Sequence, residues 1–210
     1  MAHLFPHPCS VSLLQRSIAA MLFVLAAPLF FTFAVLIRAH SPGPLFFMQW
    51  REGFGGRPFR MVKLRTMRCD AGTHLQRMLR ESADLRSEWE KFGCLRCDYR
   101  VAGPIARLAR TLSIDEIPQF LNVLRGEMVL VGPRPLPPEI ASSLSRSALE
   151  KRRTVFPGVT GLWQVCGRSD LSLRCMGQLD KLYVKNQCWR LDMWIVARTV
   201  VEVIRGRGAN

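Results

Sequence analysis

The adjacent carboxylates Asp115 and Glu116 are the residues of this chain best suited to chemistry, and they form its only Asp-Glu pair. Arg110 stands shortly before them, and a Gly-Pro-Arg-Pro turn follows at 132–135. An ionised carboxylate flanked by arginines can attack phosphorus or hold a divalent metal ion. The alternative is that both acids only cap a helix, because acidic residues are common at helix N-termini.

The residues around this acidic pair predict a short helix. Ser113 and Glu116 have the spacing of a capping box. Pro118 suits a first helical turn, and Gly126 suits the position just past a helix end. We therefore expect a helix over about residues 117–125. Both carboxylates would lie at its N-terminus, where the partial positive charge favours their ionised forms.

The charge balance indicates an anionic partner. The chain has 210 residues with 30 Lys+Arg against 16 Asp+Glu, a formal net charge of +14. Such an excess suits nucleic acid, a phosphate-bearing ligand or an acidic membrane face. Because 49% of the residues are hydrophobic, the composition favours a membrane-associated protein over a soluble nucleic-acid binder.

Cysteine and histidine offer little chemistry. Seven Cys without small-scaffold spacing indicate no disulfide framework. Cys94 and Cys97 resemble half a zinc site, but no second CxxC accompanies them, so free thiols are the preferred interpretation. Three of the four His lie within the first forty residues, which argues against a His-based catalytic pair in the body.

An apolar segment over residues 18–37 predicts a membrane element. It holds no charge, Arg16 and Arg38 flank it, and Pro28 lies in its middle. About 20 apolar residues just cross a bilayer. Basic residues on both sides favour keeping both ends on the cytoplasmic face. A helix that bends at Pro28 and returns to the same face satisfies both observations. A single span and a buried core helix are the alternatives, and a cleaved signal peptide is disfavoured by the length.

The remaining patterns predict short elements with basic decoration. Two alternating runs, 45–53 and 59–67, predict a hairpin across Gly55-Gly56. It would present either a phosphate-facing patch or only a solvated basic face, made of Gln49, Arg51, Lys63 and Arg65. Helical periodicity predicts helices over 74–92, 140–153, 173–186 and 189–205, and a short strand over 160–165. The last helix, with Trp and Arg side chains, suits either a membrane interface or core packing.

Several motifs, in order along residues 16–208, resemble the bacterial sugar transferases, the monotopic polyprenyl-phosphate phosphoglycosyl transferases. The motifs are the Pro-kinked segment, Ser-Pro-Gly-Pro (41–44), Gln-x-Arg-x-Gly (49–53), Lys-x-Arg-Thr-Met (63–67), Asp-Glu-Ile-Pro-Gln (115–119), Asn-Val-Leu-Arg-Gly-Glu-Met (122–128), Val-Gly-Pro-Arg-Pro (131–135) and Pro-Gly-Val-Thr-Gly-Leu-Trp-Gln-Val (157–165). The resemblance is strongest to the catalytic domain of undecaprenyl-phosphate hexose-1-phosphate transferases. Members of that group often carry extra membrane helices ahead of it, and this chain looks like a minimal form.

The resemblance implies a two-step reaction at the cytoplasmic face of the bacterial inner membrane. Asp115 would attack a UDP-sugar and release UMP, leaving a covalent phosphosugar-aspartyl intermediate. Undecaprenyl phosphate would then accept the sugar phosphate, the first membrane step of exopolysaccharide, O-antigen or capsule assembly. Glu116 would hold Mg²⁺ and Arg110 would bind phosphate. The other substrate contacts implied by motif position or basic charge are Gly132, Pro133, Arg134, Pro135, Arg168, Gln49, Arg51, Lys63 and Arg65.

The expected fold class is α/β, mostly α. Residues 1–40 would form a re-entrant membrane helix hairpin. Residues 41–210 would form a cytoplasmic-face catalytic domain with amphipathic interfacial helices and a short sheet from 45–67 and 160–165. A homodimer is compatible with the group, and nucleic acid is not an expected partner.

The sequence departs from the family pattern in the 98–102 loop, at Val129 and at Ala27. The excess of Arg keeps a second hypothesis open, a membrane-tethered, non-catalytic binder of anionic lipid or nucleic acid. The departures leave a third open, a membrane-anchored scaffold or regulator that has lost activity, although the intact Asp-Glu pair argues against it.

Overall fold

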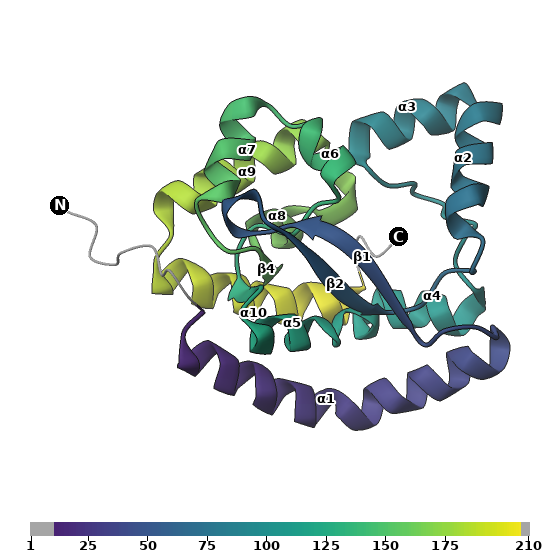
Figure 1. Ribbon diagram of the computed structural model, residues 1–210, viewed down its shortest axis with the longest axis horizontal. Coiled ribbons are helices and arrows are strands. Elements are labelled where there is room, and N and C mark those ends of the chain that lie inside the picture. The colour runs from purple at the N-terminus through teal and green to yellow at the C-terminus, as the bar shows by residue number, and fades with distance from the viewer. Residues whose placement is uncertain (1–10, 207–210) are drawn as a thin grey trace.

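A computed structural model describes residues 11–206, and its longest element is the helix α1, Leu13–His40. Ser12 caps α1 by accepting a hydrogen bond from the backbone N of Gln15 (3.3 Å). The helix is continuous across Pro28 and runs along one side of the molecule (Figure 1). The re-entrant membrane hairpin predicted for residues 1–40 is therefore not seen. One proline removes a single hydrogen bond and can bend a helix without ending it. Residues 1–10 of the predicted membrane segment lie outside the described residues.

α1 has two different faces. Phe30, Phe33, Ala34 and Ile37 turn inward and pack in one cluster with residues of the body that include Ile114. The opposite face exposes apolar side chains, namely Leu14, Met21, Val24, Leu25, Leu29, Phe31, Val35 and Leu36. Within residues 11–206, α1 is the one helix long and apolar enough to cross a membrane. Most of that apolar surface is left uncovered by the body.

The β-hairpin predicted across Gly55-Gly56 is confirmed. Strands β1 (Phe46–Glu52) and β2 (Pro58–Leu64) pair antiparallel, with Gln49 opposite Met61. They are joined through the short 3₁₀ turn η1 (Phe54–Gly56). Gly55 and Gly56 both have φ near +70° (63° and 77°), a conformation that favours glycine.

The helix predicted over 74–92 is wrong as a single element. The structure has α2 (Ala71–Glu81) and α3 (Ala83–Phe92), broken at Ser82. The Ser82 hydroxyl caps α3 by accepting from the backbone N of Leu85 (3.3 Å). Neither helix has a buried residue, and the pair projects from the body (Figure 1). Next come α4 (Gly103–Thr111), the 3₁₀ turn η2 (Ile114–Glu116) and α5 (Gln119–Arg125).

The C-terminal part contains two further corrections. The helix predicted over 140–153 is two helices, α6 (Pro138–Ser142) and α7 (Arg146–Arg153), because Ser145 caps a new helix at Ala148 N (3.3 Å). The strand predicted over 160–165 ends at Thr160. Strand β4 (Gly158–Thr160) pairs in parallel with β3 (Val129–Val131), and helix α8 (Leu162–Cys166) follows.

The last helices are confirmed, and the fold class with them. The remaining elements are η3 (Arg168–Asp170), α9 (Leu173–Asn186) and α10 (Trp189–Arg205). Within residues 11–206 the fold is a mostly helical α/β arrangement with two small, separate two-stranded sheets. Buried Tyr183 joins three elements, since its hydroxyl contacts Val131 O (3.0 Å) and Asp192 Oδ1 (2.9 Å).

Candidate active site

The acidic pair lies on η2, a tight turn between α4 and α5. Ser113 has φ of +55° and reverses the chain there, and its backbone N donates to Arg110 O (2.9 Å). The predicted capping box is wrong, because the Ser113 side chain makes no capping bond; its carbonyl instead accepts from Glu116 N (3.1 Å). Ile114 is buried in the core, and this anchors the turn that presents both acids.

Two cations from distant parts of the chain converge on this pair. Lys63, near the end of β2, places Nζ 3.0 Å from Glu116 Oε1 and 3.9 Å from Asp115 Oδ2. Arg134, from the turn after β3, donates to the same Glu116 oxygen. The structure thus brings together four of the predicted site residues, and all four side chains are largely buried.

The pKa values of the two carboxylates are pushed apart. Burial raises the pKa of Asp115, and Lys63 only partly offsets it. Burial also opposes ionisation of Glu116, but Arg134 and Lys63 together outweigh burial and hold its pKa well below the ordinary range. Neighbouring carboxylates with opposed shifts suit two different tasks. Asp115 is the more basic of the two carboxylates, and Glu116 stays ionised at neutral pH.

The Gly-Pro-Arg-Pro turn depends on close backbone packing. Gly132 N donates to Thr160 O, and Gly158 N donates to Pro133 O, both at 2.9 Å. A Cβ on Gly158 would lie 2.1 Å from Gly132 N, and one on Gly161 would lie 2.2 Å from Gly132 O. Only glycine fits at both positions. The sequence interpretation did not assign them this role, and the signal was the pair of glycines in Pro-Gly-Val-Thr-Gly.

Further basic residues surround the cluster. Arg51 donates to Pro135 O (3.3 Å) and to Gln49 Oε1 (2.7 Å). Burial, followed by the charge of Arg134, lowers the pKa of Arg51 to about 9, so it stays a cation at neutral pH. Arg168, at a φ of +46° on η3, interacts electrostatically with Glu116 and Asp115.

Arg110 also acts on Asp115, from a position beside Thr66. Its Nη1 lies 3.5 Å from Thr66 Oγ1, and its charge acts on both Asp115 and Asp98. The divergent 98–102 loop supports this position. Asp98 and Arg100 form a buried ion pair (2.6 Å), and Ala102 N donates to Thr66 O (2.9 Å).

Arg65 is placed differently from Lys63. Its guanidinium donates to Pro44 O (2.6 Å) and to the hydroxyl (3.3 Å) and carbonyl of Ser41, so it fastens the turn after α1. The structure does not bring it to the acidic pair.

Asn122 is a residue whose role sequence reasoning missed. Its Oδ1 accepts from Val62 N (3.1 Å), and its Nδ2 donates to Arg60 O (2.8 Å) and Glu127 Oε2 (2.6 Å). The side chain is wholly buried and locks α5 against β2, which carries Lys63. The Asn-Val-Leu-Arg-Gly-Glu motif marked Asn122 as a residue of interest, but it did not reveal that the side chain binds strand β2.

The donor set fits a divalent ion shared with a phosphate ligand. No cluster of three or more His, Cys, Asp or Glu occurs within residues 11–206, so the chain offers no complete metal cage there. Mg²⁺ does not require one, since it is often held by one or two carboxylates plus substrate phosphates and water. Lys63 and Arg134 both bind Oε1 of Glu116, and Glu116 is the carboxylate that would hold such an ion.

The sequence of this chain is similar to a family of known proteins. The family model described as bacterial sugar transferase matches residues 10–206. The exopolysaccharide production protein ExoY of Rhizobium meliloti is 36% identical over 200 residues, which cover 95% of this chain and 86% of ExoY.

Two relatives have more specific names. The undecaprenyl-phosphate galactose phosphotransferase of Salmonella typhimurium is 35% identical over 191 residues, 90% of this chain and 39% of that protein. The UDP-glucose:undecaprenyl-phosphate glucose-1-phosphate transferase of Caulobacter vibrioides is 39% identical over 197 residues, 89% of this chain and 66% of that protein.

Proposed function

The chain belongs to the bacterial sugar transferase family of polyprenyl-phosphate sugar-1-phosphate transferases, and from that premise we propose that it transfers a sugar-1-phosphate from a UDP-sugar to undecaprenyl phosphate. The names of its Salmonella and Caulobacter relatives support this donor and acceptor. The similarity to ExoY supports a role in exopolysaccharide synthesis. The observation that carries the proposal is the buried Asp115–Glu116 pair, held between Lys63 and Arg134.

In the first step, one carboxylate oxygen of Asp115 attacks the phosphorus that bears the sugar. A bond forms between that oxygen and phosphorus, and the bond to the bridging oxygen breaks, so UMP leaves with the bonding electron pair. The product is an acyl phosphate that links Asp115 to the sugar phosphate, a recognised covalent strategy. In the second step a phosphate oxygen of undecaprenyl phosphate attacks the same phosphorus. The Asp115 carboxylate leaves, and a lipid diphosphate sugar forms.

The basic residues stabilise the charge on the transferred group. Lys63 and Arg134 lie beside the nucleophile. Arg51 and Arg168 surround them and suit the remaining phosphate oxygens of the donor. Arg110, at Thr66, also acts on Asp115 through its charge. Preorganised cations of this kind lower the barrier where negative charge develops. Mg²⁺, held by Glu116, would supply further charge neutralisation at the diphosphate.

The same proposal places the site at the cytoplasmic face of the inner membrane. Residues 1–40 would insert in the membrane, and residues 41–210 would carry the chemistry. The outward face of α1 is apolar and exposed along its length, which suits contact with lipid. Arg16 and Arg38 at either end of the apolar stretch suit anionic headgroups. A lipid-borne acceptor requires an active site at this boundary.

The test is release of UMP from a panel of UDP-sugars by the full chain in nanodiscs with Mg²⁺ and undecaprenyl phosphate. We expect release from one donor, dependent on the lipid and absent in Asp115→Asn. Intact-mass measurement without acceptor should show a phosphosugar adduct on Asp115. Turnover that persists in the folded Asp115→Asn protein would refute the assignment of the nucleophile. If no donor released UMP, a non-catalytic binder of anionic lipid would become the better hypothesis.

A further inference from the structure

The turn that carries Arg134 is fixed at four consecutive carbonyls by three segments of the chain, namely β1, α7 and β4. Pro133 O accepts from Gly158 N (2.9 Å), and Arg134 O accepts from the side chain of Arg152. Pro135 O accepts from Arg51 Nη1 (3.3 Å), and Leu136 O accepts from Glu52 N (3.0 Å). A short loop held at every carbonyl has little freedom to shift, so the guanidinium of Arg134 is aimed in advance at Glu116.

The bond from Arg152 stands out because its donor belongs to a buried ion pair. Arg152 lies at the end of α7, and its Nη1 donates to Asp180 Oδ2 on α9. Its Nη2 donates to Arg134 O. The side chains of Arg152 and Asp180 are 9% and 1% exposed. One guanidinium thus joins an internal carboxylate to the backbone of the active-site turn.

Packing alone does not account for this pair. α7 already packs on α9 through apolar contacts, in a cluster that includes Ala148, Leu144 and Met176. A buried ion pair seldom improves stability over apolar side chains of the same volume, since both ions lose their hydration. A fork that reaches two acceptors in fixed directions is a property of arginine rather than of lysine.

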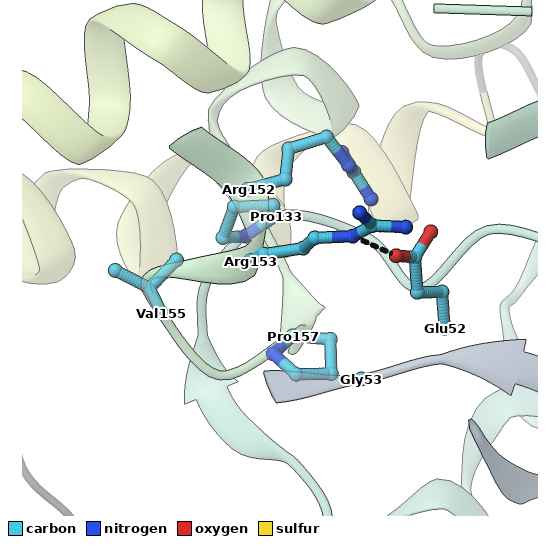
Figure 2. Close-up of a pocket in the computed structure, with 7 residues that line it drawn as sticks. All are labelled: Glu52, Gly53, Pro133, Arg152, Arg153, Val155 and Pro157. Carbon is cyan, nitrogen blue, oxygen red and sulfur yellow. Dashed lines mark hydrogen bonds and ion pairs between the residues drawn. The ribbon is translucent and has the colours of Figure 1, made fainter. Parts of the chain in front are cut away.

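Arg152 does not act by direct contact with substrate. Figure 2 shows Arg152 beside Arg153 and Pro133, with the Arg153 guanidinium directed at Glu52. The cavity at this place is about 10 Å³, roughly the room for one water molecule. A nucleotide sugar does not fit in a cavity of that size, which favours an effect of Arg152 through the turn over direct contact.

We propose that Arg152, with Asp180 as its counter-ion, is a positioning residue that holds the main chain at Arg134 and so keeps the Arg134 guanidinium on Glu116. This inference rests on the proposed transferase function. Small misplacements of a charged group beside a reacting centre lower rates by about 10- to 100-fold. We expect a loss of that size in kcat for Arg152→Met, with the protein still folded.

The test is a double-mutant cycle measured as UMP release per folded protein in nanodiscs. It compares wild type, Arg152→Met, Arg134→Gln and the double variant. If Arg152 acts through Arg134, the double variant turns over within about threefold of Arg134→Gln alone, because coupled residues are not additive. A multiplicative loss in the double variant, or wild-type turnover in Arg152→Met, would overturn the proposal.

Two further variants keep the test decisive. Arg146→Met removes one positive charge from the same helix, at a side chain that is 92% exposed, and should leave turnover unchanged. Arg152→Lys keeps the positive charge and replaces Arg152→Met in the test if that variant fails to fold. We expect it to fold and still lose about tenfold in kcat, since one ammonium cannot repeat the fork. Wild-type turnover in Arg152→Lys would refute the positioning role. A wild type that releases no UMP would instead refute the proposed function, so the two failures are distinguishable.

Discussion

Two regions of this molecule reverse the usual distribution of side chains. Around Asp115, charged groups are buried: Lys63, Glu116 and Arg134 lie within one cluster with at most a fifth of each side chain exposed. Along the outward face of α1, apolar groups are exposed, with Leu25 at 70% and Phe31 at 60%. In a water-soluble monomer both arrangements would cost free energy.

The contrast indicates that each region needs a different binding partner. The four buried groups balance in charge, but Arg51, Arg168 and Arg110 also act on the two carboxylates, so cations outnumber carboxylates around the pair. This excess suits a polyanionic ligand. The apolar face has no protein partner within residues 11–206, which suits lipid. The two regions share the inward face of α1, because Ile114, next to Asp115, packs in one cluster with Phe33 and its neighbours. The predictions below separate the two regions, in order of expected effect.

The largest effect is expected inside the charged cluster. Asp115→Asn should lower turnover by at least about 10⁴-fold, since it removes the nucleophile itself. The unfolding temperature should change by no more than about 5 °C, because Glu116 keeps both of its cationic partners. UMP release and thermal unfolding of the same preparation measure the two quantities. A large loss of stability would mean that Asp115 is structural.

The inward and outward faces of α1 should respond differently to the same change. Phe33→Ala removes a ring that is 9% exposed and should cost about 4 kcal/mol of unfolding free energy. Phe31→Ala, two residues away, removes a ring that is 60% exposed and should cost less than about 1 kcal/mol. Thermal unfolding in one detergent compares them. Equal losses would contradict the division of α1 into two faces.

A charge on the outward face should weaken membrane binding. Leu25→Asp places a carboxylate on the exposed apolar face. It should make the free energy of membrane association less favourable by about 3 kcal/mol. Flotation with anionic liposomes measures the bound fraction. Ser87→Asp adds the same charge to an exposed position of α3 and is the matched control. Unchanged flotation of Leu25→Asp would mean that this face does not enter lipid.

The last prediction concerns the buried carboxylate of Asp180, whose effect emerges only as the pH changes. Burial raises the pKa of Asp180 to about 6, against 3.8 for an ordinary aspartate. The folded state therefore binds this proton more tightly than the unfolded state does. The resulting stability is present below pH 4 and is lost as the pH rises through 6. Relative to Asp180→Asn, wild type should gain up to about 3 kcal/mol between pH 7 and pH 4.

Unfolding at both pH values in both proteins checks this last prediction. Groups other than Asp180 titrate alike in the two proteins, so the difference isolates this carboxylate. A difference that did not vary with pH would mean that Asp180 keeps an ordinary pKa despite its burial.

The sequence predicted the parts of the fold that local patterns determine. The hairpin followed from alternation around Gly55-Gly56, and the bounds of α9 and α10 followed from periodicity. The breaks at Ser82 and Ser145 were missed, because a serine that caps a new helix also fits inside an amphipathic pattern. The parallel pairing of β3 and β4 was missed because three-residue strands have no recognisable period.

The candidate site was predicted in its members more than in its geometry. Asp115, Glu116, Lys63 and Arg134 were all named, and the structure brings them together. Arg65 was grouped with Lys63 because both are basic and two residues apart. It lies beyond the end of β2, where local alternation no longer fixes the direction of a side chain. The contact between Arg152 and Asp180 spans 28 residues and two helices, a separation that no local pattern encodes.

The packing of Ile114 against α1 has a consequence for the height at which the reaction occurs. If the outward face of α1 rests in lipid, then Asp115, one residue after Ile114, is held on the side of α1 that faces away from the lipid. This placement would let the acceptor phosphate react within the headgroup layer, without moving the lipid out of the bilayer. An acceptor with a spacer of several atoms between its isoprenoid chain and its phosphate should then react more slowly than the natural one, although its charge is unchanged.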